Sequence, residues 1–136
     1  SGHAPTSIGE IIDFGKLLKV REGGRDVVPV AVQNADTLEV ILVAYTDEEA
    51  FLRSVRERKL ILWSTSRSEL WEKGATSGET FELKEVYVNC EQNSLLYKVI
   101  PRRGGICHTR NRGGEPRNCF YRKLNMDTMD LENLDP

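Results

Sequence analysis

Two dense apolar stretches dominate the first third of the chain. Residues 27–33 and 38–45 are rich in the aliphatic and β-branched side chains that strands prefer. Between them, Asn34-Ala35-Asp36-Thr37 is typical of a turn, so the two stretches are expected to form a β-hairpin. Pro29 predicts that the first stretch is an edge strand or lies at the start of a strand, because proline cannot donate a ladder hydrogen bond.

The pattern becomes helical after this hairpin. Thr46-Asp47-Glu48-Glu49 matches a capping box, with Thr46 as N-cap and Glu49 three residues later. The helix is expected to end near Glu57, and one of its sides carries Ala50, Phe51, Val55 and the stem of Arg58. A second short amphipathic helix is predicted over residues 9–20, where Gly15 interrupts the pattern.

Three further strands are predicted, at residues 59–64, 81–88 and 94–100. In the second of them, Phe81, Leu83 and Glu85 alternate against Glu82 and Lys84. A tight turn that carries Cys90 joins the last two strands. The pattern therefore favours a sheet-rich α+β fold, with about five strands in a barrel-like mixed sheet and two or three short helices.

Length and composition fit one globular domain. The chain has 136 residues, of which 29% are charged and 39% hydrophobic. We expect a tag-like, disordered segment at residues 1–8, a single domain over residues 9–124 and an acidic tail over residues 125–136. The formal net charge of -2 gives no reason to expect a nucleic-acid or membrane partner. An apolar run long enough to span a bilayer and a secretory signal are both missing, which favours the cytoplasm and reduced thiols.

Charge is distributed unevenly near the C-terminus. Residues 101–123 contain seven basic residues and one acid, Glu115, whereas residues 124–136 contain only acids among their charged residues. A basic loop in a mildly acidic protein favours a small anionic ligand such as a phosphate. The alternative is an ordinary solvated basic loop.

Three cysteines and one histidine fall within thirty residues. Cys90 follows an apolar run, Cys107 is followed directly by His108, and Cys119 comes after a loop rich in glycine and arginine. Three thiols with one open position for water are typical of a catalytic zinc site. The alternative is three inert buried cysteines, because free cysteine often acts as a small hydrophobic residue.

Residues 63–78 combine tryptophans, hydroxyls, cations and glycines. Hydroxyls and backbone amides in such a segment can hold phosphate oxygens, which Arg67 and Lys73 can neutralise. The tryptophans can stack on a planar base or fill the core. On these residues alone, a core strand with an ordinary loop is favoured over a ligand site.

Together these segments resemble the phosphoribosyl-AMP cyclohydrolase family of histidine-biosynthesis enzymes. The matching blocks are Trp63-Ser64-Thr65-Ser66-Arg67, Leu70-Trp71-x-Lys73-Gly74-Ala75-Thr76-Ser77-Gly78, the turn at Cys90, Cys107-His108-Thr109, and Cys119-Phe120-Tyr121. The resemblance runs from about Val27 to Arg122 without rearrangement.

The resemblance implies a sheet-rich homodimer that opens the adenine ring of phosphoribosyl-AMP between N1 and C6. It implies a zinc ion held by Cys90 of one subunit and by Cys107 and Cys119 of the other. Zinc would activate a water molecule, and His108 would assist proton transfer or orient the water. The implied substrate-binding residues are Trp63, Ser64, Ser66, Arg67, Lys73, Thr76, Ser77, Gly78 and Arg110.

The chain departs from the family pattern at two places. The family's magnesium turn is Asp-Cys-Asp-x-Asp, whereas this chain has Asn89-Cys90-Glu91-Gln92-Asn93. Magnesium prefers charged oxygen ligands, so its affinity at Asn89, Glu91 and Asn93 should fall sharply. The loop over residues 109–118 is longer than is usual in the family and adds positive charge beside the zinc ligands.

Three hypotheses follow. The first is a zinc cyclohydrolase that acts on phosphoribosyl-AMP, and the second is a paralogue that acts on a different purine-like or amidine-containing substrate. The third is a zinc- or nucleotide-binding module without catalysis, against which the retained Cys90, Cys107, His108 and Cys119 speak.

Overall fold

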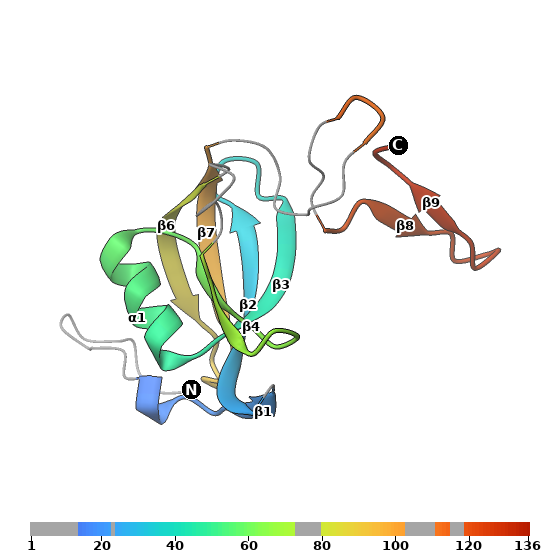
Figure 1. Ribbon diagram of the computed structural model, residues 1–136. Helices are drawn as coiled ribbons and strands as arrows, with labels where there is room; N and C mark the ends of the chain where they lie inside the picture. The colour runs from blue at the N-terminus through green and yellow to red at the C-terminus, as the bar shows by residue number, and fades with distance from the viewer. Residues whose placement is uncertain (1–13, 23, 73–79, 103–110, 115–118) are drawn as a thin grey trace.

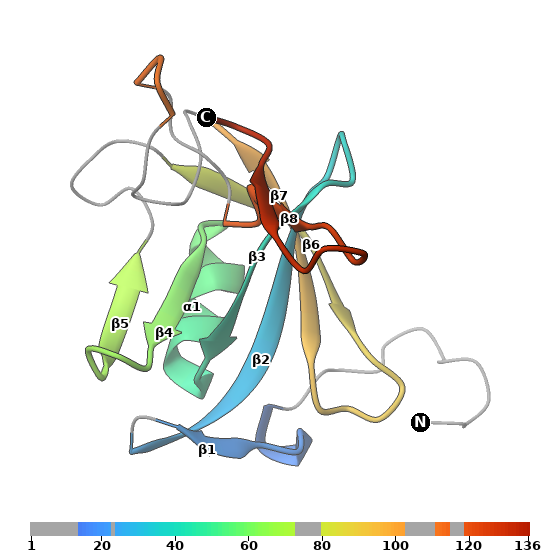
Figure 2. The same ribbon diagram turned by 90° about the vertical axis from the view of Figure 1, so that its right-hand side faces the viewer.

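The computed structural model describes residues 14–22, 24–72, 80–102, 111–114 and 119–136, and one curled mixed sheet dominates them (Figures 1 and 2). The sheet has seven strands within these residues, in the order β5-β4-β3-β2-β7-β6, and β1 pairs with β2. The elements in chain order are η1 (Phe14–Lys16), β1 (Val20–Glu22), β2 (Arg25–Asn34), β3 (Val40–Thr46), α1 (Glu48–Glu57), β4 (Ile61–Ser64), β5 (Glu69–Glu72), β6 (Phe81–Val88), β7 (Leu95–Pro101), β8 (Arg122–Leu124) and β9 (Leu131–Asn133).

The predicted first hairpin is confirmed as β2 and β3. Its turn is held by Asn34, whose Oδ1 accepts hydrogen bonds from the backbone N–H groups of Asp36 (2.8 Å) and Thr37 (3.0 Å). The expectation for Pro29 is wrong, because β2 is an interior strand between β3 and β7. Pro29 is tolerated there because it precedes Val30, the first residue of β2 that pairs with β7.

The mixed character of the sheet arises from one pairing. β2 and β7 run parallel, whereas the other paired strands described here run antiparallel. β6 and β7 form the predicted pair around the Cys90 turn, with a register shift between Leu83 and Glu85. This bulge corrects the predicted alternation, because Glu85 is exposed and Val86 packs against the core instead.

Helix α1 begins one residue later than the capping box predicted. Its N-cap is Asp47, whose Oδ1 accepts a hydrogen bond from the Ala50 N–H at 2.7 Å. Thr46 instead ends β3, where it is buried. The helix ends as predicted at Glu57, and Arg58 forms a left-handed C-cap rather than part of the packed face.

The apolar side of α1 packs on the concave face of the sheet (Figures 1 and 2). Phe51 lies in the core and its ring centroid is 5.4 Å from that of Phe14. The sheet curls far enough that the segment before β4 meets β6, through a bridge between Lys59 and Glu82. The Leu83 N–H also donates to the Arg58 carbonyl (3.0 Å). The result is a half-barrel around one hydrophobic core, which confirms the sheet-rich α+β prediction.

The described residues contain more strands than the pattern predicted. β1 and β5 are short, and residues 122–133 of the expected C-terminal region contain the β8–β9 hairpin, which stands away from the sheet in Figure 1. Of the helix predicted over residues 9–20, residues 9–13 lie outside the described part and Phe14–Lys16 form a single 3-10 turn. Within the described residues, no helix combines the length and apolar character needed to cross a membrane.

Candidate functional site

The Trp-Ser-x-Ser-Arg block forms the end of β4 and the turn into β5. Ser64 pairs with Glu69, and the turn between them brings the Ser64 and Ser66 hydroxyl oxygens to 3.3 Å. Arg67 folds back over the same turn, with its backbone N 3.3 Å and its Nε 3.5 Å from Ser64 Oγ. Two hydroxyls and the remaining guanidinium donors of Arg67, which also pairs with Glu69 (3.6 Å), give this exposed cluster the donors of an anion site.

Trp63 lies on the opposite, inner side of this hairpin. Its side chain is buried, and the Arg25 guanidinium stacks on its ring with 4.5 Å between the guanidinium carbon and the ring centroid. Of the two roles open for this tryptophan, its burial favours packing over stacking on a base.

Arg25 and Asp47 link this block to helix α1, and the sequence pattern did not single them out as part of a site. The Arg25 Nη1 lies 3.1 Å from the buried Asp47 Oδ2, while the other Asp47 oxygen caps the helix. The signal available in the sequence was Asp47 itself, a good N-cap residue directly before Glu48 and Glu49.

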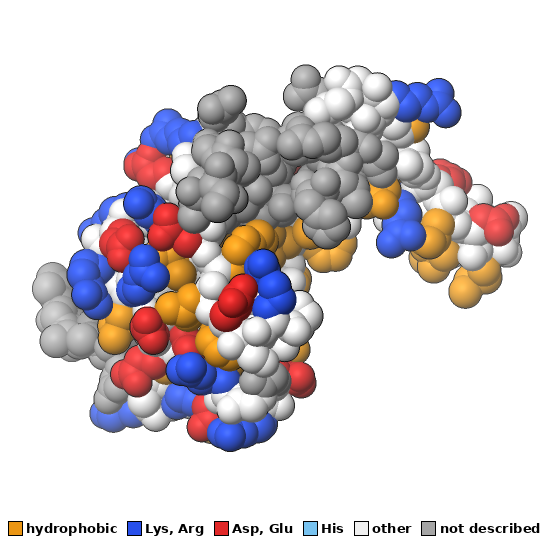
Figure 3. Space-filling view, in the orientation of Figure 1, with side chains coloured by type: hydrophobic (Ala, Val, Ile, Leu, Met, Phe, Trp, Pro, Cys, Tyr) orange, Lys and Arg blue, Asp and Glu red, His pale blue; other side chains and the backbone are white. Residues whose placement is uncertain are grey.

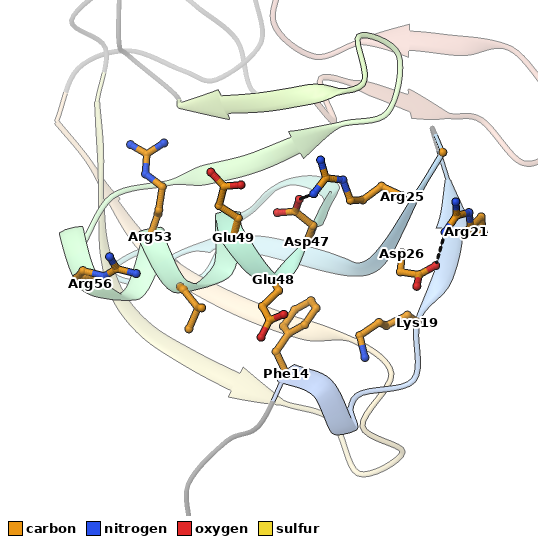
Figure 4. A pocket seen from close by; sticks show the side chains of 12 residues that line it. Phe14, Lys19, Arg21, Arg25, Asp26, Asp47, Glu48, Glu49, Arg53 and Arg56 are labelled. Carbon is orange, nitrogen blue, oxygen red and sulfur yellow. Dashed lines mark hydrogen bonds and ion pairs between the residues drawn. The ribbon is translucent and has the colours of Figure 1, made fainter.

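A cavity of about 780 Å³ opens beside this ion pair, between β1, the start of β2 and α1 (Figure 4). Part of its charged lining forms ion pairs, since Arg21 contacts Asp26 (3.1 Å) and Arg53 contacts Glu57 outside the cavity (3.0 Å). A groove of about 900 Å³ lies between α1 and β6. Among the described residues, those that line the two hollows include no residue that the motifs selected as a site residue.

The turn that carries Cys90 is closed by its neighbours. Asn89 Oδ1 accepts hydrogen bonds from the backbone N–H groups of Asn93 (2.9 Å) and Ser94 (3.0 Å). Asn89 Nδ2 donates to Asn93 Oδ1 at 2.6 Å, and Asn93 Nδ2 lies 3.4 Å from Glu91 Oε2. Cys90 itself is exposed at this end of β6.

Cys119 lies elsewhere on the sheet. It is exposed, and its backbone N–H donates to the Ile41 carbonyl of β3 at 3.1 Å. β2 and β7 separate β3 from β6, so three strand spacings of about 4.8 Å lie between the two cysteine regions. Two thiolates that share a zinc ion lie within about 4–5 Å of each other. The thiols of Cys90 and Cys119 in one chain are therefore too far apart to share a metal ion in this arrangement.

The remaining predicted site residues lie outside the described part of the chain. They are Lys73, Thr76, Ser77, Gly78, Cys107, His108 and Arg110. Among the residues that the structure does describe, no group of three or more histidine, cysteine and acidic side chains is placed to hold a metal.

Comparison with known proteins adds to this geometry. The family model for phosphoribosyl-AMP cyclohydrolase matches residues 42–121, which span β3 to the segment before β8 and include the Trp63, Cys90 and Cys119 blocks. A phosphoribosyl-AMP cyclohydrolase of Halobacterium salinarum is 40% identical over 125 residues, which are 92% of each chain.

Two further relatives agree. A phosphoribosyl-AMP cyclohydrolase of Cenarchaeum symbiosum is 42% identical over 83% of this chain and 93% of its own. The histidine biosynthesis bifunctional protein HisIE of Thermus thermophilus is 43% identical over 85% of this chain and 51% of its own. The extent of these matches shows that the chain belongs to the phosphoribosyl-AMP cyclohydrolase family.

Proposed function

We propose that the protein is a zinc-dependent cyclohydrolase that opens the adenine ring of phosphoribosyl-AMP in histidine biosynthesis. The observation that carries this proposal is the family match across residues 42–121, within which the three thiols and the Trp-Ser-x-Ser-Arg block are all present. In the reaction, water adds its oxygen to C6, the N1–C6 bond breaks, and N1 receives a proton.

Zinc fits the donor set that the chain offers. Cys90, Cys107 and Cys119 would supply three thiolates, the soft ligands that zinc prefers, and leave a fourth position for water or substrate. Bound zinc would supply the acidity that makes water a nucleophile near neutral pH. Cys90 and Cys119 are both exposed at their positions in the fold, so each thiol is accessible to a metal ion that a second chain helps to bind.

A homodimer would complete this zinc site. The separation of Cys90 from Cys119 within one chain supports a site that takes Cys90 from one subunit and Cys107 and Cys119 from the other. Exposed apolar side chains on the β8–β9 hairpin and on β3 support an interface between two copies (Figure 3). On the hairpin and its connecting loop they are Leu124, Met126, Met129 and Leu131, and on β3 they are Val40 and Val43.

The other site residues have two proposed roles, which are phosphate binding and proton transfer. Arg67, with Ser64 and Ser66, has the donors to bind phosphate oxygens at the β4–β5 turn. Lys73, Thr76, Ser77, Gly78 and Arg110 would extend that grip, and His108 would carry the proton between the water and the ring.

Turnover of phosphoribosyl-AMP by the purified, zinc-loaded protein tests the proposal. Ring opening changes the ultraviolet spectrum of the substrate, and we expect turnover that Cys119→Ser abolishes together with bound zinc. Leu52→Ser, at an exposed position of α1, is the matched control and should keep both. Zinc-loaded protein that leaves the substrate unchanged, with or without magnesium, would refute the assignment.

A second candidate keeps the chemistry and changes the substrate. The altered turn at residues 89–93 and the longer loop at residues 109–118 favour a paralogue that hydrolyses a different cyclic amidine. Rescue of a histidine auxotroph that lacks its own cyclohydrolase separates the two candidates. Rescue at normal expression supports phosphoribosyl-AMP as the substrate, and failure by a folded, zinc-loaded protein supports the alternative.

A further inference from the structure

The turn between β6 and β7 is closed by a network of neutral side chains. Asn89 is fixed first, because the two N–H groups that point at it can only donate, so the atom they meet must be the amide oxygen. Asn89 Nδ2 then faces Asn93 and requires an acceptor there, which fixes the Asn93 oxygen in turn. Asn93 Nδ2 is left to face the carboxylate of Glu91.

This network consumes the oxygen atoms that a cation would need. Both lone pairs of Asn89 Oδ1 accept backbone N–H groups, and Asn93 Oδ1 accepts the Asn89 amide. The Asn89 Nδ2 and Asn93 Nδ2 groups inside the turn are N–H donors, which repel a cation. Glu91 is the one carboxylate among residues 89–93, whereas magnesium in proteins takes charged oxygen ligands in a nearly ideal octahedron. The residues of this turn therefore do not fit the magnesium ion that family resemblance implies for it.

The backbone is closed independently of a metal as well. The Asn89 N–H donates to the Ser94 carbonyl (3.2 Å) and the Gln92 N–H to the Asn89 carbonyl (3.0 Å). The Gln92 carbonyl accepts the Leu18 N–H at 2.8 Å, which ties the turn to the segment before β1. These contacts hold Cys90 in place from both sides.

We propose that Asn89 and Asn93 are positioning residues that replace a divalent cation, so that the Cys90 turn forms and presents its thiol without magnesium. The replacement works because the Asn89 amide donates to Asn93 across a 2.6 Å contact. Two carboxylates at the same positions would bring like charges together, and a bound cation or proton would be needed to relieve the repulsion. The inference rests on the proposed function only in treating Cys90 as a zinc ligand.

Cation binding by the zinc-loaded, full-length protein tests the proposal without any measurement of turnover. The probes are MgCl2 in thermal unfolding at constant ionic strength, and Mn2+ followed by the electron paramagnetic resonance signal of the free ion. For the wild-type protein we expect a Tm that does not respond to millimolar magnesium and no loss of the free Mn2+ signal. One saturable Mn2+ site, or a magnesium-dependent rise in Tm, would overturn the proposal.

A double substitution tests the replacement directly. Asn89→Asp with Asn93→Asp should lower the Tm in the absence of a cation, and saturating magnesium should raise it by on the order of 5–10 °C. Asn34→Asp is the control, because Asn34 Oδ1 also accepts two backbone N–H groups, in the β2–β3 turn, and the Tm of this variant should stay independent of magnesium.

A double variant that remains insensitive to magnesium would show that the asparagine pair does not replace a cation. Should the double variant fail to fold, the wild-type Mn2+ measurement still decides the proposal. Absent turnover on phosphoribosyl-AMP would refute the proposed function and leave both cation measurements interpretable, so the two failures are distinguishable.

Discussion

Tyr97 shows how one side chain limits the conditions under which the core is stable. It lies on β7, fully buried, and burial raises the pKa of its hydroxyl well above the ordinary value of 10.0. In the unfolded chain the same hydroxyl ionises near that ordinary value. The stabilisation that comes from a neutral Tyr97 is therefore complete below about pH 10 and is lost as the pH rises further.

We predict that Tyr97→Phe flattens the alkaline loss of stability. Above about pH 10 the wild-type free energy of unfolding should fall by an additional ~1 kcal/mol per pH unit relative to the variant, because only the wild-type unfolded chain releases that proton. Urea unfolding at a series of pH values measures both slopes. The other tyrosines are common to both proteins, so equal slopes would contradict a buried neutral Tyr97.

For single residues, the sequence shows the chemical capacity of a side chain more directly than its role in the structure. The Ser64, Ser66 and Arg67 block does lie together in the β4–β5 turn, because its residues are adjacent in the chain, and its binding of an anion stays a prediction. The choice between Thr46 and Asp47 as N-cap is wrong, because both are good cap residues and only burial of Thr46 at the end of β3 decides between them.

Helix α1 depends on Asp47, the N-cap that the sequence pattern does not select. Asp47 joins the first turn of the helix to Arg25 on β2, and Arg25 in turn covers Trp63 on β4. One carboxylate therefore couples the helix to two strands of the sheet.

We predict that Asp47→Ala lowers the free energy of unfolding by about 2 kcal/mol, mostly through the lost N-cap. The ion pair contributes less than about 1 kcal/mol, because the Arg25 side chain is 48% exposed and solvent screens it. Asp47→Asn keeps an acceptor for the Ala50 N–H and should cost about half as much. Urea unfolding compares them, and an equal loss in both variants would assign the effect to the charge instead of the cap.

Strands with a clear apolar pattern are predictable from this sequence, and short charged strands are not. β6 matches its predicted range of residues 81–88, because Phe81 and Leu83 mark its buried face. β1 consists of Val20, Arg21 and Glu22, all exposed, and it is a strand only because it pairs with β2. The bulge in β6 is not predictable from the sequence pattern either, because it depends on the register of β6 with β7.

At the scale of the whole molecule, the C-terminal β8–β9 hairpin leaves apolar side chains exposed to solvent. The β8–β9 hairpin is two-stranded, and such a hairpin is at best marginally stable alone in water. Its connecting loop leaves Met126 84% and Met129 70% exposed. Under the proposed dimer, these side chains contact the second copy.

We predict that Met126→Asp with Met129→Asp weakens the dimer by on the order of 100- to 10,000-fold, because each buried methionine contributes roughly 1.5–3 kcal/mol. Zinc content should fall with it, since the site would need Cys90 of the partner subunit. Sedimentation equilibrium and metal analysis measure the two effects, and Leu52→Asp on α1 is the control. An unchanged dimer would place the interface elsewhere.

The parallel pairing of β2 with β7 affects how the chain folds during its synthesis. Val30 pairs with Leu95, and α1 and four other strands of the sheet lie between them in the sequence. Because loop-closure entropy opposes such a distant contact, the central pair forms late and slows folding. During synthesis on the ribosome, β2 cannot form its hydrogen bonds with β7 until β7 has emerged. The sheet can therefore close only after the chain through β7 has been synthesised.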